Sequence, residues 1–312
     1  MSGRRQAVQT IRQPSSSALL IDSLDRYPLG YPFSVAGLIS SSSWTTQKQN
    51  YVLNGYFNRL SLTQIQLFWN LPTIITGYND KMEVIVGSTT YTIIVPQGFY
   101  NATQIANNLV TQLNAAGTGS TWTFTAINAP PPLIILNSTL AFTIVVPTTS
   151  SSQMGRFYET AGIIPQTAVL SGGVYTMATP SLPTLLPTRF IDITSHYLTK
   201  FQRVKDASTL TTGDSQNILA RVYAFSSYGD MSWPPVSSAT SQTSPYTTTW
   251  TWEVPSTFVV VQDYSSPKNI AWNPDEAISN FDITILDEYG NQLPWSPQYG
   301  VEFQMTLLAS ET

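Results

Sequence analysis

Few side chains in this sequence could carry out acid–base or nucleophilic chemistry. The only histidine is His196, beside the end of an expected strand, so a Ser-His-Asp triad would have to use it. No Gly-x-Ser-x-Gly elbow is present to supply the serine. A single histidine in a chain without cysteine also cannot build a zinc-type cluster. We therefore expect His196 to have a structural or surface role.

Two pairs of neighbouring carboxylates could serve a glycosidase or hold a calcium ion. They are Asp22 with Asp25, and Asp287 with Glu288. Neither pair stands in a calcium-loop pattern, and acid pairs in loops usually form turns or face water. The segment beginning at Ser171, Ser-Gly-Gly, lacks the lysine of a phosphate-binding loop. The sequence thus predicts no enzyme activity, no cofactor and no metal site.

Two asparagines and a group of tryptophans could serve recognition instead of chemistry. Asn101 and Asn137 both match the glycosylation pattern Asn-x-Thr. Asn101, with Gln104 three residues later, also has the form of a helix cap, which we favour. The late tryptophans could stack on sugars, although packing in the core or in a subunit interface is the favoured use. They are Trp233, Trp250, Trp252, Trp272 and Trp295.

The charge content restricts the class of protein. Charged residues make up 10% of the chain, against about 25% in an ordinary soluble domain. A monomer with so few charges would be poorly protected against association, so we infer that other chains or further copies cover much of its surface. A solvated β-rich surface is the alternative. The net charge of −4 argues against a nucleic-acid-binding body.

The absence of cysteine and of long apolar runs indicates in which cellular compartment the chain is expected to fold. No cysteine is present, so disulfides do not hold the fold together, which suits assembly in a reducing environment. No apolar run reaches the roughly 18 residues of a membrane span. We expect neither a signal peptide nor a membrane anchor.

The end of the chain has the alternation of half-buried strands. In residues 279–309, apolar side chains recur at every second position on both sides of a proline-containing loop, which predicts a closing hairpin. A hairpin needs a partner sheet, because alone it is marginally stable. Residues 57–69 are the best partner, although their apolar residues change phase halfway. A bulge near Thr63 and Gln64 would return both sets to one face.

A compact unit is predicted between residues 81 and 146. Gly87 and Ser88 mark a hairpin turn, and Asn101 begins a helix that ends at Gly117. Three strand-like runs follow, at residues 122–124, 133–136 and 142–146. The order ββαβββ could form a layer of helix on sheet.

The rest of the chain predicts strands separated by long Ser, Thr and Pro-rich connections, which is typical of a β-sandwich. These strands are expected at residues 189–193, 218–225, 250–252 and 257–261. The last is a continuous apolar run of the kind found in a sandwich interior.

Two groups of basic residues are candidate subunit contacts. The N-terminal arm carries Arg4, Arg5 and Arg12 and no acidic residue up to position 17, so it could touch an acidic neighbouring protein or nucleic acid, or act as a flexible leader. The second group mixes charge with apolar residues and favours contact with a neighbouring chain. It consists of Lys200, Arg203 and Lys205.

Several motifs follow one another in an order shared with a known group of proteins. They are Ile21-Asp-Ser-Leu-Asp-Arg, Val95-Pro-Gln-Gly-Phe-Tyr, Phe190-Ile-Asp-Ile-Thr-Ser, Leu198-Thr-Lys-Phe-Gln-Arg, Leu286-Asp-Glu-Tyr-Gly and Met305-Thr-Leu-Leu. In this order they resemble minor capsid proteins of large double-stranded DNA viruses and virophages, most closely the penton (vertex) proteins. The resemblance implies a jelly roll that ends in the closing hairpin, an inserted domain, and pentamers beside a double-jelly-roll major capsid protein. Residues 150–181 match nothing in this pattern.

We therefore predict a mainly β protein with a single jelly-roll β-sandwich, an inserted small α+β (ββαβββ) domain and an extended N-terminal arm. The expected bounds are 1–30 for the arm, 31–72 with 187–312 for the jelly roll, and 78–147 for the insertion, with 148–186 an unassigned connector.

The expected function is structural. The chain would form a homopentamer in the virion capsid, assembled in the host cytoplasm or nucleus, and contact the major capsid protein and other minor capsid proteins but no specific nucleic acid. A carbohydrate- or receptor-binding fibre or spike module is the main alternative. A β-sandwich glycoside hydrolase is the third.

Overall fold

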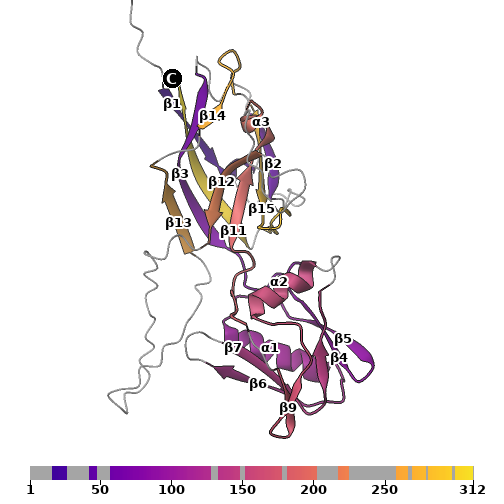
Figure 1. Cartoon of the computed structure of the whole chain (residues 1–312). Coiled ribbons are helices and arrows are strands. Elements are labelled where there is room, and N and C mark those ends of the chain that lie inside the picture. The colour runs from indigo at the N-terminus through magenta and orange to yellow at the C-terminus, as the bar shows by residue number, and fades with distance from the viewer. Residues whose placement is uncertain are drawn as a thin grey trace, which may run out of the picture.

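Antiparallel β-sheets with few helices make up the described part of the chain (Figure 1), which confirms the mainly β prediction. The computed structural model describes residues 16–26, 42–47, 57–127, 133–147, 152–177, 181–201, 217–224, 258–265, 269–278, 280–296 and 299–311. In these ranges no helix has both the length and the apolar character needed to cross a bilayer.

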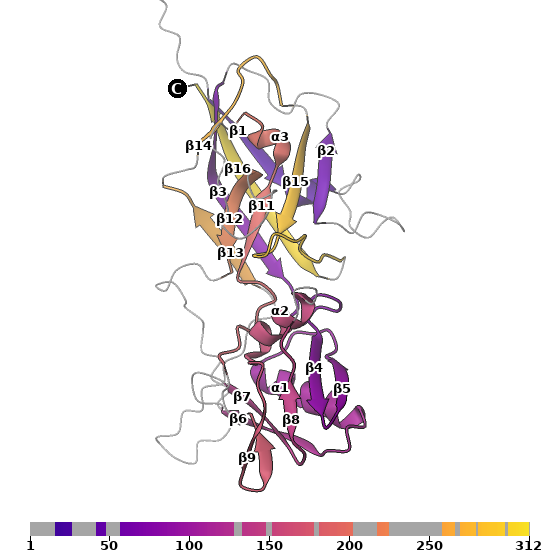
Figure 2. The same ribbon diagram turned by 45° about the vertical axis from the view of Figure 1, so that its right-hand side comes forward.

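Two sheets pack face to face around the larger of two hydrophobic cores (Figures 1 and 2). The first has the order β1 (Ser16–Asp22), β16 (Gly300–Ser310), β3 (Arg59–Asn70) and β13 (Phe258–Asp263), and β14 (Asn269–Ala271) also pairs with β3. The second has the order β12 (Ile218–Tyr223), β11 (Phe190–Thr194), β15 (Asn280–Leu286) and β2 (Ser43–Gln47). Trp69, Phe281 and Phe303 are among the largest side chains buried between the sheets.

The longest pairing joins β3 to β16, the partner strand predicted from the sequence. The register shifts once, because Thr306 lies opposite Gln64 and the next residue, Leu307, lies opposite Leu62. Thr63 is therefore the extra residue of a bulge, at the predicted position. Leu60 and Leu62 before it are buried, and so are Ile65, Leu67 and Trp69 after it, as the bulge requires.

The predicted closing hairpin is wrong as a pairing, although both of its strands exist. β15 pairs with β11 and β2, whereas β16 pairs with β1 and β3, so the two lie in different sheets. Alternation shows that one face of a strand is buried but not which sheet the strand joins. The long connection between them crosses from one sheet to the other.

The strand expected within residues 257–261 is present as β13, but its apolar run is buried on one face only. Val260 is 6% exposed, whereas Val259 and Val261 are 55% and 53% exposed. The first sheet meets the core with one of its faces, and alternate residues of β13 point to opposite faces, so only Val260 of these three reaches the core.

A second core forms between β3 and β11 in chain order. It includes a sheet of β5 (Thr89–Ile94), β4 (Lys81–Val86) and β8 (Phe142–Ile144), and another of β6 (Trp122–Ile127), β7 (Leu133–Ser138), β10 (Val174–Thr176) and β9 (Val169–Ser171). Helices α1 (Ala102–Ala115) and α2 (Ser152–Ala161) pack on these sheets.

Helix α1 begins at the predicted cap. The Asn101 side chain accepts a hydrogen bond from the Gln104 backbone N–H at 2.9 Å, and the Gln104 side chain accepts one from the Asn101 N–H at 2.9 Å. This capping box satisfies two backbone donors that a helix start leaves open. Ile105, Leu109 and Leu113 then face the core.

Two sequence assignments need correction. Residues 16–26, placed in the arm, form β1 and a 3-10 turn (Ser23–Arg26), and Leu19 and Ile21 lie in the larger core. The arm was therefore predicted too long. Within 148–186, left unassigned, α2, β9 and β10 contribute to the second core, so this segment is part of a packed body and not a mere connector.

Candidate functional site

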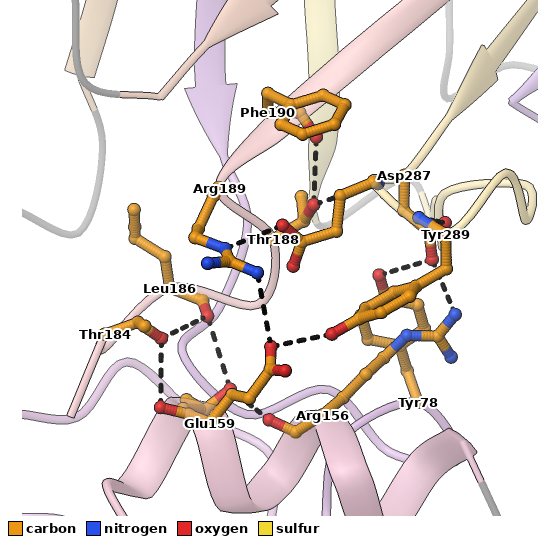
Figure 3. A network of polar contacts seen from close by, with 12 residues as sticks. Tyr78, Arg156, Glu159, Thr184, Leu186, Thr188, Arg189, Phe190, Asp287 and Tyr289 are labelled. Carbon is orange, nitrogen blue, oxygen red and sulfur yellow. Dashed lines mark hydrogen bonds and ion pairs between the residues drawn. The ribbon is translucent and has the colours of Figure 1, made fainter. Parts of the chain in front are cut away.

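A buried ion pair joins the two cores at the point where they meet (Figure 3). Arg156 on α2 places a guanidinium nitrogen 2.7 Å from the carboxylate of Asp287, which directly follows β15. Tyr78, from the segment between β3 and β4, donates its hydroxyl to the same carboxylate at 2.8 Å. The Asp287 and Arg156 side chains are 0% and 7% exposed. We call Tyr78, Arg156, Glu159, Arg189, Asp287, Glu288 and Tyr289 the junction.

The chain itself holds the Asp287 carboxylate in place. The backbone N–H groups of Tyr289 and Asn291 donate to its other oxygen at 2.9 and 2.8 Å. Gly290 has a φ of +78°, a left-handed conformation that suits glycine and lets the loop fold back over the carboxylate. Four donors in total surround this side chain, which is how a buried charge is tolerated.

Two aromatic rings flank the Arg156 guanidinium. Its central carbon lies 4.3 Å from the ring centre of Tyr78 and 5.1 Å from that of Tyr289. The Tyr289 hydroxyl donates to Glu159, one turn further along α2, at 2.7 Å. Burial, followed by neighbouring carboxylates, raises the pKa of both tyrosines above its usual range, so their hydroxyls stay protonated donors.

The rim of the junction carries a second, more exposed ion pair. Arg189 lies 2.8 Å from Glu288 and 3.9 Å from Glu159, and its own side chain is 58% exposed. Burial raises the pKa of Glu288 despite the opposing effect of Arg189. Exposed pairs of this kind contribute little to stability. Loss of one partner of the buried pair, by contrast, would leave an uncompensated buried charge.

The residues of the junction stabilise the contact between the two cores and have no free group for catalysis at Asp287. The carboxylates of the junction are held by donors of the same chain, and Asp287 is too deeply buried to meet a substrate. Asp287 was expected to form a turn or to face water; it forms the turn, but it is buried. Among the described residues, no group of three His, Asp or Glu side chains is placed to hold a metal ion.

The surroundings of His196 look superficially like a triad. Asp282 on β15 accepts hydrogen bonds from the Ser195 hydroxyl at 2.9 Å and from the backbone N–H groups of His196 and Tyr197 at 2.9 and 2.8 Å. The His196 ring instead contacts the Asn217 side chain. Because Ser195 caps the short helix α3 (His196–Thr199), this arrangement anchors a helix start and does not activate a hydroxyl.

Asp282 is held as a carboxylate by these contacts. Burial alone would raise its pKa, but the N–H groups of Tyr197 and His196 and the Ser195 hydroxyl bring the pKa below its ordinary value.

Lys200 is the single member of the predicted basic contact groups that lies among the described residues. Its ammonium pairs with Glu276 and lies 4.0 Å from the ring centre of Tyr197, 4.9 Å from that of Phe201 and 5.4 Å from that of Trp272. Arg4, Arg5, Arg12, Arg203 and Lys205 fall outside the described residues.

Most remaining candidate residues have local structural roles. Asp22 accepts from the Leu24 N–H at 2.8 Å and from the Gln304 side chain at 2.7 Å. The glycines after Ser171 form the β9–β10 turn. The Asn137 amide donates to Thr125 at 3.1 Å.

The described tryptophans contact their own chain. Trp272 is buried and donates to the Glu276 carbonyl at 2.7 Å, and Trp295 lies against Arg26, with 5.0 Å between ring centre and guanidinium. Trp233, Trp250 and Trp252 lie outside the described residues.

Sequence reasoning missed Arg156 and Tyr78. Helix α2 had a usable signal, because Met154, Phe157, Tyr158 and Ala161 recur at helical spacing and all are buried. The pairing of Arg156 with Asp287 spans 131 positions and has no local signal.

Comparisons with known proteins found structural but not sequence matches. No family model matches the chain, and no curated protein does. The crystal structure of the mavirus penton protein is 13% identical, with 96% of this chain and 100% of that chain covered and a TM-score of 0.48. A chain of the Sputnik virophage structure is 11% identical, with 95% and 98% covered and a TM-score of 0.42. Both alignments extend over nearly the full length of this chain.

Proposed function

We propose that this chain is a penton-type minor capsid protein, a structural component of a virion that assembles as a homopentamer at the five-fold vertices. It would contact the major capsid protein and other minor capsid proteins, and it would catalyse no reaction. The order of the sandwich strands carries the proposal.

That strand order has the pattern of a jelly roll. With the short β14 left aside, the strands fall in chain order in the first sheet, the second and the first, then twice in the second, and finally in the first, the second and the first. The resulting sheets, β1-β16-β3-β13 and β12-β11-β15-β2, pair strands from the two ends of the chain. Jelly rolls of this kind are common in viral capsids, although lectins and cupins also use them. The order of the sequence motifs supports the capsid class.

The outer surface of the first sheet supports an assembly role. Phe68 and Val259 lie directly opposite each other on β3 and β13, and they are 48% and 55% exposed. Val261 follows on the same face at 53%. Exposed apolar side chains grouped in this way favour contact with another protein.

We propose that the sandwich makes the capsid contacts. The unit around the second core would be an insertion between β3 and β11, held against the sandwich by the junction. Arg4, Arg5 and Arg12 would reach neighbouring subunits, together with Lys200, Arg203 and Lys205.

Five-fold closure requires a heterologous interface, in which one face of a copy meets a different face of the next. Native mass spectrometry of the full chain tests it. The expected main species has five times the 34.4 kDa mass of one chain. A stable monomer that also fails to join capsids in a co-assembly assay would contradict the proposal.

A further inference from the structure

The unit around the second core is almost without charge. From Val84 to Gly155 the sequence has no Asp, Glu, Lys, Arg or His, and none follows Glu159 until Arg189. Residues 74–188, which contain this unit, therefore carry two positive charges, Lys81 and Arg156, and three negative ones, Asp80, Glu83 and Glu159. Asp80 is buried, and three of the four net negative charges belong to the rest of the chain.

Strand β5 is an open edge of this unit. In the sheet β5-β4-β8, β5 pairs with β4 alone, and both views show it on the outside of the unit, with no described element beyond it (Figures 1 and 2). Its sequence, Thr-Thr-Tyr-Thr-Ile-Ile from Thr89 to Ile94, has no proline and no charge. Natural edge strands are usually protected by lysine, proline or a bulge. β5 has none of these.

The backbone of β5 offers regularly spaced donors and acceptors. The Val95 N–H bonds to the Asp80 carbonyl at 2.8 Å, so Val95 faces β4. Since residues of an antiparallel strand face alternate sides, Thr90, Thr92 and Ile94 direct their N–H and C=O groups away from β4. The side chains of these same three residues are exposed.

We propose that β5 is a docking edge for β5 of a second copy, with which it pairs antiparallel about a two-fold axis at Thr92. In this register Thr92 lies opposite Thr92 of the second copy, and Thr90 lies opposite Ile94. Threonine pairs and threonine–isoleucine pairs are favourable across strands. The two three-stranded sheets become one continuous sheet.

Charge favours a second copy as the occupant. Two molecules with a net charge of −4 repel one another through most of their surfaces, but the units around the second core, each with one excess negative charge and with Asp80 buried, meet with little of that cost. Because no ionic contact is involved, the pairing should be insensitive to salt. The contact goes beyond the proposed capsid role, since a two-fold pairing is distinct from the heterologous contacts of a five-fold ring.

Disulfide cross-linking of the full chain tests the register. The protein has no cysteine, so Thr92→Cys introduces a single thiol. Directly opposed residues that exchange hydrogen bonds have Cα atoms about 5.5 Å apart, which suits a disulfide. We expect Thr92→Cys to form a covalent dimer under mild oxidation. Thr90→Cys, which faces Ile94, and the exposed Thr123→Cys on β6 should form little.

Sedimentation provides a second measurement. The measured step is the pairing of two monomers or of two pentamers, which doubles the sedimenting mass. Thr92→Lys places two like charges opposite each other and should weaken this doubling step by about tenfold or more, whereas Thr123→Lys should not. Thr92→Cys that cross-links no better than Thr123→Cys, or a doubling step unchanged by Thr92→Lys, would overturn the proposal. If Thr92→Cys does not cross-link, native mass spectrometry can still find the five-subunit mass. If the chain does not form pentamers, Thr92→Cys can still cross-link two copies. The two proposals are therefore tested separately.

Discussion

The guanidinium of Arg156 lies 2.7 Å from the carboxylate of Asp287, and both side chains are buried (Figure 3). This ion pair connects helix α2 of the second core to the loop that follows β15 of the first core. Removing one partner of such a pair leaves the other as an uncompensated buried charge. The contact between the two bodies is therefore sensitive to the loss of either partner of this pair.

Asp287→Asn should destabilise the protein by about 3–5 kcal/mol, because it leaves the Arg156 charge buried and unbalanced. Adding Arg156→Met should recover part of that loss, since the double variant has no unpaired charge. Urea unfolding followed by tryptophan fluorescence measures both. Wild-type stability in Asp287→Asn, or no recovery in the double variant, would show that the pair is not what holds the junction.

Asn101→Ala should cost about 1 kcal/mol, because it removes the side-chain acceptor at the start of α1. Asn107→Ala, at an exposed position in the same helix, is the matched control and should stay within about 0.5 kcal/mol of the wild type. Thermal unfolding of both variants makes the comparison. Equal effects of the two substitutions would contradict the role of the cap.

Deletion of Thr63 should prevent folding. Without the bulge, either the apolar residues before it or those after it, Ile65, Leu67 and Trp69, would turn to the outer face of β3. Each buried side chain contributes about 1.5–3 kcal/mol, so the loss rivals the whole stability of a domain. Thr63→Ala keeps the residue count and should cost about 1 kcal/mol, the value of its bond to the Thr306 carbonyl. Soluble, cooperatively folding protein from the deletion would argue against the bulge.

Asp282 should make the protein sensitive to acid. Its pKa is lower in the folded chain than in the unfolded one, so its stabilising effect is present above the unfolded value near 3.9. That effect is lost as the pH falls through the lower folded pKa. Asp282→Asn should therefore be less stable than wild type at pH 7, and the gap should narrow below about pH 4. A gap that stays constant over this range in pH-dependent unfolding would contradict the assignment.

Local patterns predicted the elements and one irregularity. The phase change in the apolar residues of β3 predicted the bulge, because alternation reports directly which face each side chain occupies. The Asn101 and Gln104 spacing likewise predicted the cap of α1, since both contacts lie within one turn.

Relations between distant segments could not be predicted in this way. The alternation in β15 and β16 is the same whether they pair with each other or lie in different sheets, so the predicted hairpin was wrong. Helix α2 is short and contains Gly155, which made its helical spacing easy to overlook. The pairing of Arg156 with Asp287 depends on how two bodies pack, which no local pattern records.

The amount and position of the protein in purified particles of the virus that encodes it test the central claim most directly. Quantitative mass spectrometry should find it at tens of copies per virion, in fixed ratio to the major capsid protein, and cryo-electron microscopy should place five copies around each vertex. Absence from purified virions, or presence at one or a few copies away from the vertices, would contradict the capsid function proposed for this chain.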